Sequence, residues 1–153
     1  MEKPQPVVVK VVTPEDREEA YRIRIEVFVT EQGYPEEGEI DHYDAVATHL
    51  ILVFPTSDTP RRAYGTVRMV TLPDGTGKLG RLCVAAKLRG MGAGALLVRA
   101  LEKEAKEMGL SAIVLSAQVH AKGFYEKLGY GFPDGGVEYM DDGAPHVKMA
   151  KTL

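Results

Sequence analysis

The sequence predicts a mixed α/β fold, in which helices cover a mixed sheet. Two observations support this class. Strand-like segments follow one another in the first half of the chain and alternate with helical segments in the second half. The chain has 153 residues, of which 44% are hydrophobic and 27% charged, so it can bury a core without disulfides or metals. We therefore expect residues 1–153 to form a single domain.

The first elements are a strand and a helix. Residues 7–12 form a β-branched run, which is typical of a strand. Thr13 fits a helix N-cap, and Pro14 fits the first turn. Residues 22–29 alternate between apolar and charged side chains like a strand, but the strong cap and the lack of an internal turn favour a helix.

The middle of the chain reads as consecutive strands joined by turns. Residues 33–44 are acidic and rich in turn formers, which indicates a loop. Glycine, proline and aspartate mark the two turns that follow, and β-branched and apolar residues mark the strands. The predicted strands cover residues 45–54, 63–70 and 78–84, and the predicted turns cover residues 55–60 and 73–75.

The clearest helix covers residues 92–108. Apolar residues recur on one face of it, and Glu102 and Lys106 are spaced for an ion pair on the other face. The members of the apolar face are Ala93, Leu97, Ala100, Leu101, Ala105 and Met108.

The last part of the chain contains shorter elements. Residues 111–117 form an apolar strand pattern, and residues 120–128 form a short helix that Gly129 ends. The final predicted strands are residues 130–132 and 146–150, on either side of a glycine-rich turn at residues 133–136.

Composition excludes several classes of protein. The formal net charge is −3, which argues against a nucleic-acid or anionic-membrane partner. The single cysteine, Cys83, cannot form an intrachain disulfide, which is typical of a reducing compartment. No apolar run approaches the roughly 20 residues that span a bilayer. We expect a soluble cytoplasmic protein that needs no metal.

The most informative segment runs from Lys87 to Gly94, with the sequence KLRGMGAG. It follows a strand and opens the longest helix, where free backbone N–H groups and the helix dipole favour a diphosphate. Lys87 and Arg89 could add charge-assisted contacts. The spacing fits neither a P-loop nor a dinucleotide-binding motif. A glycine-rich turn without a ligand is the alternative reading.

This segment resembles the hallmark of the GNAT superfamily of N-acetyltransferases, R/Q-x-x-G-x-G/A. The motif residues are Arg89, Gly90, Met91, Gly92, Ala93 and Gly94. Residues 80–84 resemble the fourth strand of that family, and residues 124–130 resemble its F-Y-x-x-x-G-F/Y segment. Residues 24–32, Asp41, Asp44, residues 117–118 and residues 143–147 resemble the small ElaA-like branch, so the similarity covers nearly the whole chain.

The resemblance implies acetyl-coenzyme A as cosubstrate. The fold that it implies is a mixed central sheet of about six to seven strands flanked by about four helices. The fourth and fifth strands would splay, and the pantetheine arm would lie between them. Leu82, Cys83 and Val84 would then make main-chain contacts, with a Cys83 or Val84 N–H near the thioester carbonyl. Gln118 would face the other side of the arm.

The resemblance also implies that Tyr125 protonates the leaving thiolate. The alternative is a tyrosine buried for packing. Cys83 could act as a nucleophile, but a lone cysteine in an apolar strand is usually a small buried hydrophobe.

The general base is left open by the sequence. His146 is our first choice, because it begins a predicted strand next to a turn and belongs to the ElaA-like pattern. The other candidates are His42, His49, His120, Glu26 and Glu31. The acidic residues from Glu31 to Asp44 could attract a cationic amine, although a solvated loop is the commoner meaning of such a run.

We therefore expect direct transfer of an acetyl group from acetyl-coenzyme A to a primary amine, first of all a small molecule, in a ternary complex. Two alternatives stay open: a coenzyme A sensor without turnover, and an acetyltransferase for protein lysines or N-termini. A homodimer is also compatible with the sequence.

Overall fold

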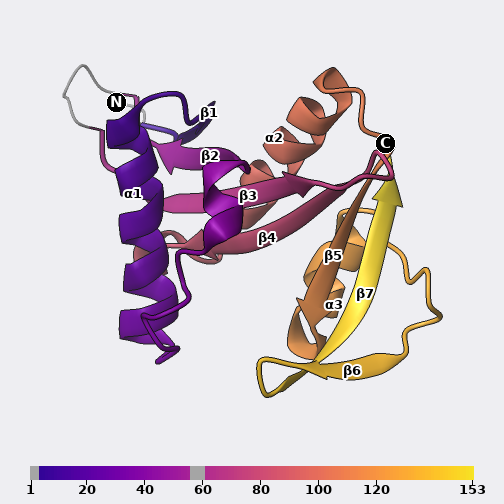
Figure 1. Cartoon of the computed structure of the whole chain (residues 1–153). Coiled ribbons are helices and arrows are strands. Elements are labelled where there is room, and N and C mark those ends of the chain that lie inside the picture. Colours follow the sequence, from indigo (N-terminus) through magenta and orange to yellow (C-terminus); the bar gives the residue numbers. More distant parts are fainter. Residues whose placement is uncertain (1–3, 56–60) are drawn as a thin grey trace. The chain divides into compact units, whose positions relative to one another are not determined.

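A computed structural model describes residues 4–55 and 61–153, which form three α-helices and seven strands (Figure 1). The strands are β1 (Val7–Lys10), β2 (Thr48–Val53), β3 (Gly65–Thr71), β4 (Gly77–Val84), β5 (Ala112–Gln118), β6 (Glu138–Asp141) and β7 (Ala144–Thr152). The α-helices are α1 (Pro14–Arg24), α2 (Ala93–Glu107) and α3 (Lys122–Lys127). Shorter helices are the π-helix η1 (Ile25–Glu31) and the 3-10 helices η2 (His42–Ala45), η3 (Ala86–Leu88) and η4 (Val119–Ala121).

The strands belong to one sheet in the order β1-β2-β3-β4-β5-β7-β6. Pairing is antiparallel in β1–β2, β2–β3, β5–β7 and β6–β7 and parallel in β4–β5, which confirms the predicted mixed sheet. The chain divides into two compact units, residues 1–70 with 81–101 and residues 71–80 with 102–153. A single domain for residues 1–153 therefore stays a prediction.

In the first unit, α1 begins as the sequence predicts. The Thr13 side chain accepts a hydrogen bond from the Asp16 N–H over 3.1 Å, and Pro14 is the first helical residue. Helical structure then continues through the alternating stretch as η1, in which Gln32 N–H bonds to the carbonyl of Val27 five residues earlier. The helix prediction for this stretch is confirmed, and the strand-like alternation was misleading.

The predicted loop at residues 33–44 contains η2, which the sequence did not reveal. Asp41 caps this helix through its side chain, and Asp44 completes a capping box by bonding back to the Asp41 N–H. Strand β2 consequently starts at Thr48, three residues later than predicted. Of the turn predicted at residues 55–60, all but Pro55 lies outside the described residues.

The core of the first unit lies on both faces of its strands. Ile51 and Val53 of β2 are buried in one cluster with Ala20 and Ile23 of α1 and Val27 of η1. Side chains alternate along a strand, so the Leu52 side chain lies on the other face of β2. There it is close to Gly65 of β3 and to Leu97 of α2. A Cβ at Gly65 would stand 2.9 Å from the Cys83 carbonyl oxygen, so glycine is needed there.

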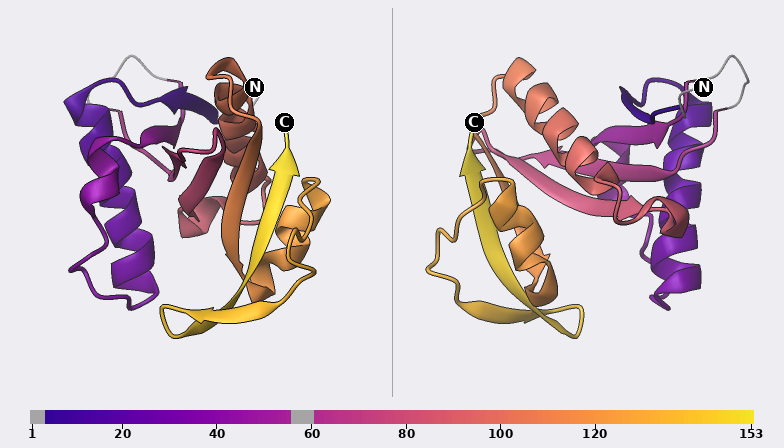
Figure 2. Two further views of the ribbon diagram at one scale, coloured as in Figure 1. Left: turned by 45° about the vertical axis from the view of Figure 1, so that its right-hand side comes forward. Right: turned by 180° about the vertical axis from the view of Figure 1, so that it is seen from behind.

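In the second unit, α3 lies alongside the strands β5 and β7 (Figure 2). The predicted strand at residues 130–132 is wrong: only an isolated bridge joins Gly131 to Ala150 among the described residues. The strand that pairs with β7 on its outer side is instead β6, which the sequence analysis missed. The turn predicted at residues 133–136 is present.

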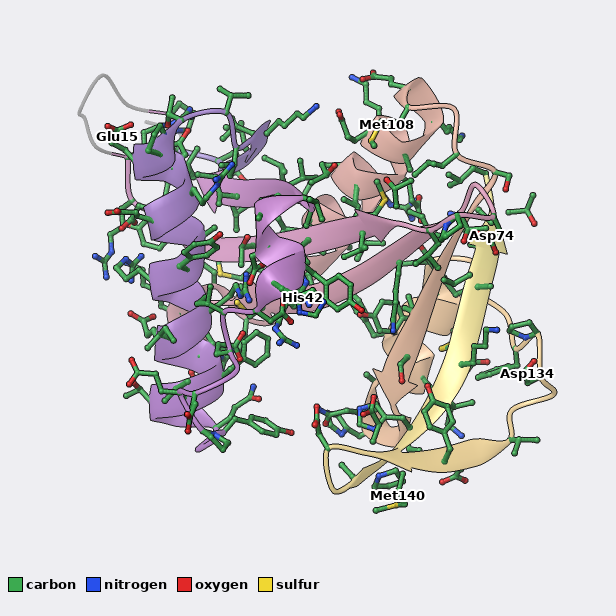
Figure 3. The ribbon with its side chains drawn as sticks, in the orientation of Figure 1. Glu15, His42, Asp74, Met108, Asp134 and Met140 are labelled. Carbon is green, nitrogen blue, oxygen red and sulfur yellow. The ribbon has the colours of Figure 1, made fainter. Side chains whose placement is uncertain are left out.

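The face of α2 that was predicted to carry an ion pair, opposite its apolar face, also differs from the prediction. Glu102 is buried and does not form the expected pair with Lys106, because its carboxylate accepts hydrogen bonds from Tyr130 and Lys151. Met108, labelled in Figure 3, lies just beyond the helix and is 42% exposed, so it does not extend the apolar face. Ala93, Leu97, Leu101 and Ala105 are buried as predicted.

Candidate active site

The segment between β4 and α2 has the geometry of an anion-binding turn. Gly90 and Gly92 both adopt φ of 79°, which side chains other than glycine rarely adopt. A Cβ at either position would meet no atom within 4 Å, so the backbone is open to a ligand. The first hydrogen bond of the helix joins Leu96 N–H to the Gly92 carbonyl, and the amides before it have no acceptor inside the helix. These features fit a diphosphate.

Strand β4 bends immediately before the residues predicted to contact the thioester. Arg81 has φ of 52°, in the left-handed region that costs energy for a residue with a Cβ. Its guanidinium is held by Glu39, with 2.9 Å between Arg81 Nε and Glu39 Oε2, and by Asp41 at 3.3 Å. These contacts help to hold the bent conformation that leads into Leu82.

Cys83 points into the core of the first unit, while its neighbours Leu82 and Val84 are half-buried. Burial raises the pKa of the Cys83 thiol to about 12. A buried, protonated thiol is a poor nucleophile, because the thiolate is the reactive form. Cys83 can therefore contribute through its backbone, and its side chain does not favour an acyl-enzyme route.

Tyr125 lies in α3 and is nearly buried between two aromatic side chains. Its ring centroid is 5.0 Å from that of Phe124 and 5.7 Å from that of Tyr130. Burial raises its pKa to about 12, so the phenol carries its proton at neutral pH. The geometry agrees with both predicted roles, since a packed tyrosine can also donate a hydrogen bond.

His146 lies in a row of side chains across three strands. It pairs with Gln118 of β5 on one side and with Tyr139 of β6 on the other, and cross-strand partners share a face of the sheet. Its Nδ1 lies 2.8 Å from the Ala144 carbonyl oxygen, which can only accept a hydrogen bond. In the neutral imidazole the proton is therefore on Nδ1, and Nε2 has the free lone pair of a base.

Comparisons with known proteins agree with this geometry. Residues 56–153 match the family described as Acetyltransferase (GNAT) domain. A Bacillus subtilis protein named as a candidate acetyltransferase is 41% identical over 147 residues, covering 94% of this chain and 95% of that protein. The chain belongs to the GNAT acetyltransferase family.

Solved structures with the same fold cover nearly all of the chain. A crystal structure of a candidate N-acetyltransferase from Lactobacillus plantarum has a TM-score of 0.86 and 31% identity, covering 97% of this chain and 98% of that one. Escherichia coli ElaA has a TM-score of 0.79 at 23% identity, with 96% and 99% covered, and this likeness concerns the fold alone. A Pseudomonas aeruginosa protein described as an acyl-CoA N-acyltransferase has a TM-score of 0.80 at 24% identity, with 97% and 99% covered, and this likeness also concerns the fold alone.

The two cations of the GNAT motif segment already have partners within the protein. Arg89 forms a bidentate ion pair with Glu31, and its Nη2 lies 2.8 Å from Glu31 Oε1. Lys87 places its Nζ 4.5 Å from the ring centroid of Tyr64. With Tyr64 and Glu26, Lys87 lines a surface pocket of about 280 Å³ in the first unit.

The acidic stretch of this GNAT protein is largely neutralised by arginines. Arg24 and Asp44 are buried and lie 2.7 Å apart, from Nη1 to Oδ1, and Glu39 also accepts a hydrogen bond from Arg24. Arg68 bonds to both Asp41 and Asp44. Glu31, Glu39, Asp41 and Asp44 are therefore paired with arginines, while Glu36 and Glu37 are exposed.

The acidic candidates for the base are weak. Glu31 is engaged by Arg89, whose hydrogen bonds lower the pKa of Glu31. Glu26 accepts a hydrogen bond from Arg22 over 3.3 Å. A carboxylate with a lowered pKa is a weaker base, so Glu31 does not suit proton abstraction near neutral pH, and the Glu26 carboxylate is engaged by Arg22.

The three histidines other than His146 lie in other parts of the structure. His49 is buried, its Nε2 lies 2.9 Å from the Asp44 carbonyl oxygen, and burial lowers its pKa. His42 is exposed on η2, where its ring centroid lies 4.0 Å from that of Tyr43 (Figure 3). His120 is exposed and does not cap α3, whose N-cap is Ala121. His146 therefore remains the first candidate for the general base, in the tautomer with the proton on Nδ1, where it is bonded to the Ala144 carbonyl oxygen.

The described residues contain no group of three or more histidine, cysteine or acidic side chains placed to hold a metal ion. No helix within residues 4–55 and 61–153 has the length and hydropathy of a membrane span.

Proposed function

We propose that this protein transfers the acetyl group of acetyl-coenzyme A directly to the primary amine of a small molecule, in a ternary complex. The observation that carries the proposal is the turn from Arg89 to Gly94, where two glycines with φ of 79° open α2. Family membership supports an acyl-coenzyme A donor, and the backbone of this turn can bind its diphosphate.

On this proposal, His146 is the general base. Its Nδ1–H donates to Ala144, so Nε2 accepts the proton that the amine loses as it attacks the thioester carbonyl. A backbone N–H of Cys83 or Val84 stabilises the developing oxyanion. Gln118, half-buried at the end of β5, contacts the pantetheine arm.

Tyr125 acts on the leaving group. A phenol with a pKa of about 12 is a much weaker acid than an ordinary thiol, whose pKa is about 8.5. Complete proton transfer from Tyr125 to the leaving thiolate is therefore unfavourable. A hydrogen bond from the phenol to the sulfur as the C–S bond breaks lowers the barrier without that cost, and we assign this role to Tyr125.

The experiment is a screen of small primary amines with the full chain and acetyl-coenzyme A, following release of free thiol. Amine-dependent thiol release and an acetylated product support the proposal. Intact-protein mass spectrometry with acetyl-coenzyme A alone should show no covalent acetyl group, because the Cys83 thiol is buried and protonated.

Other outcomes contradict specific parts of the proposal. Binding of coenzyme A without turnover on any amine would support the sensor alternative. Turnover only on peptides with a lysine or a free N-terminus would replace the small-molecule acceptor with a protein. An acetyl adduct on Cys83 would replace direct transfer with a two-step route.

A further inference from the structure

Arg89, the first residue of the glycine motif, makes three contacts with the protein. Its Nε donates to the carbonyl of Val84, the last residue of β4, over 3.0 Å. Its Nη1 and Nη2 donate to the two carboxylate oxygens of Glu31. The guanidinium therefore ties the turn that it begins to the end of β4 and to the end of η1.

Glu31 is a well-supported anchor, although its side chain is 39% exposed. It is the last residue of η1, and η1 is fixed to the core by Val27, which is 2% exposed. π-helices are rare and often occur near functional sites. Here the π-helix ends at the carboxylate that holds Arg89.

We propose that Arg89 and Glu31 are a positioning pair, which holds the turn between β4 and α2 in shape so that its backbone amides bind the donor diphosphate. On this view the Arg89 guanidinium is not itself a phosphate ligand. The inference rests on the proposed function, because it assumes that coenzyme A binds at this turn.

The electrostatics support positioning over direct contact. The charge of Arg89 is balanced by Glu31, and the bidentate geometry uses the two nitrogens that a phosphate would need. Hydrogen bonding to Glu31 raises the pKa of Arg89, as expected for a cation that is paired with a carboxylate. A diphosphate that recruited Arg89 would first have to break this pair.

The two views predict opposite effects of Glu31→Gln. If Arg89 contacts the diphosphate, removing the competing carboxylate frees it, and coenzyme A binds more tightly. If the pair positions the turn, coenzyme A binds about fivefold more weakly, the scale of one partly exposed ion pair. Calorimetric titration of the full chain with coenzyme A measures the difference. Titrations at about 0.5 M salt screen the long-range effect of the lost charge.

Three further variants separate geometry from charge. Glu37→Gln removes an exposed acid of the same stretch and should leave the dissociation constant unchanged. Arg89→Lys keeps the positive charge but loses the planar guanidinium, which donates hydrogen bonds to both Val84 and Glu31. Positioning predicts a loss like that of Glu31→Gln, and the Glu31→Gln/Arg89→Lys double variant should lose little more, because both changes break the same unit.

The outcomes are distinguishable. Tighter or unchanged binding in folded Glu31→Gln, or parental binding in Arg89→Lys, overturns the positioning role and leaves the proposed function standing. Failure of the parental protein to bind coenzyme A overturns both. Thermal unfolding identifies any variant that fails to fold, and Glu31→Asp, which keeps the charge on a shorter side chain, should regain part of the affinity. With saturating donor, kcat should stay within about twofold of the parental value, because the pair acts on binding and not on the chemical step.

Discussion

Arg24 has no exposed surface, and its Nη1 lies 2.7 Å from Asp44 Oδ1, which is almost as deeply buried. The two residues stand 20 positions apart in the chain, in α1 and η2. Arg24 also donates to the side chain and the carbonyl oxygen of Glu39. One buried guanidinium thus fixes the segment between the first helix and β2.

Removing this cation should be costly for stability. Arg24→Met keeps much of the side-chain volume but removes one of the three arginines that balance Glu39, Asp41 and Asp44, and Arg68 and Arg81 alone leave one negative charge uncompensated. We therefore expect a loss of about 3–5 kcal/mol in the free energy of unfolding. Urea unfolding at neutral pH measures it. Arg99→Met, on the exposed face of α2, is the control and should change stability by less than about 0.5 kcal/mol. Equal losses in both variants would contradict the role assigned to Arg24.

Acid should destabilise the protein through Asp44. Burial alone would raise the pKa of this carboxyl, but hydrogen bonds from Arg24, the Asp41 backbone and Arg68 hold it well below its usual range. A depressed folded pKa stabilises the protein above the unfolded value of about 3.9, and the stabilisation is lost as pH falls below it.

We therefore expect the free energy of unfolding to fall from about pH 4 downward, with Asp44 as a main cause. Asp44→Asn should be less stable at pH 7 and should show a smaller further loss in acid. Urea unfolding at a series of pH values tests this, and an unchanged acid dependence in Asp44→Asn would assign the effect to other carboxylates.

Gly92→Glu should weaken donor binding. The substitution puts a Cβ at φ of 79° and a carboxylate next to the proposed diphosphate site, so we expect coenzyme A to bind at least about tenfold more weakly. Gly109→Glu is a matched control, because Gly109 has φ of 80° at the other end of α2 and is also exposed. If calorimetry finds parental affinity in folded Gly92→Glu, the turn is not the donor site.

Tyr125→Phe should lower kcat with little effect on donor affinity. The change removes one hydroxyl and preserves the packing against Phe124 and Tyr130, and loss of a positioned proton or hydrogen-bond donor typically costs about 10²-fold in rate. Steady-state kinetics with saturating donor provides the measurement. Tyr130→Phe is the control: its hydroxyl bonds to Glu102, so it should affect stability and spare kcat. An unchanged kcat in Tyr125→Phe would leave Tyr125 with a packing role.

His146→Gln should change the pH dependence as well as the rate. A base that must be unprotonated gives kcat/KM a rising limb on the acidic side, and glutamine cannot supply it. We expect the variant to be slower by about 10²-fold and to lose this limb. A parental pH profile and rate in His146→Gln would show that the base lies elsewhere, and His120 would be tested next.

Much of the fold could be predicted because local signals agreed with the tertiary structure. The cap at Thr13, the glycines around α2 and the β-branched strands each specify a backbone conformation within a few residues. Strand β6 could not be predicted in this way. All four of its residues are exposed, so it has no apolar pattern, and it forms because β7 offers an unpaired edge.

The same division applies to the candidate site. The glycine motif and Tyr125 were visible because the residues of each motif are close in sequence. The bend at Arg81 was not, because a left-handed arginine is unfavourable by itself and depends on ion pairs with Glu39 and Asp41, some 40 positions earlier. The pair of Arg89 with Glu31 spans 58 positions.

The sequence by itself thus determined the family, the order of most elements and the turn at which a diphosphate would bind, because those properties depend on neighbouring residues. Only the tertiary structure decided what the charges do. Six acids between Glu31 and Asp44 look like a surface for cations, yet four of them are bound by arginines from other elements. A charged side chain in sequence has no fixed partner, and folding selects the partner that offsets the cost of its desolvation.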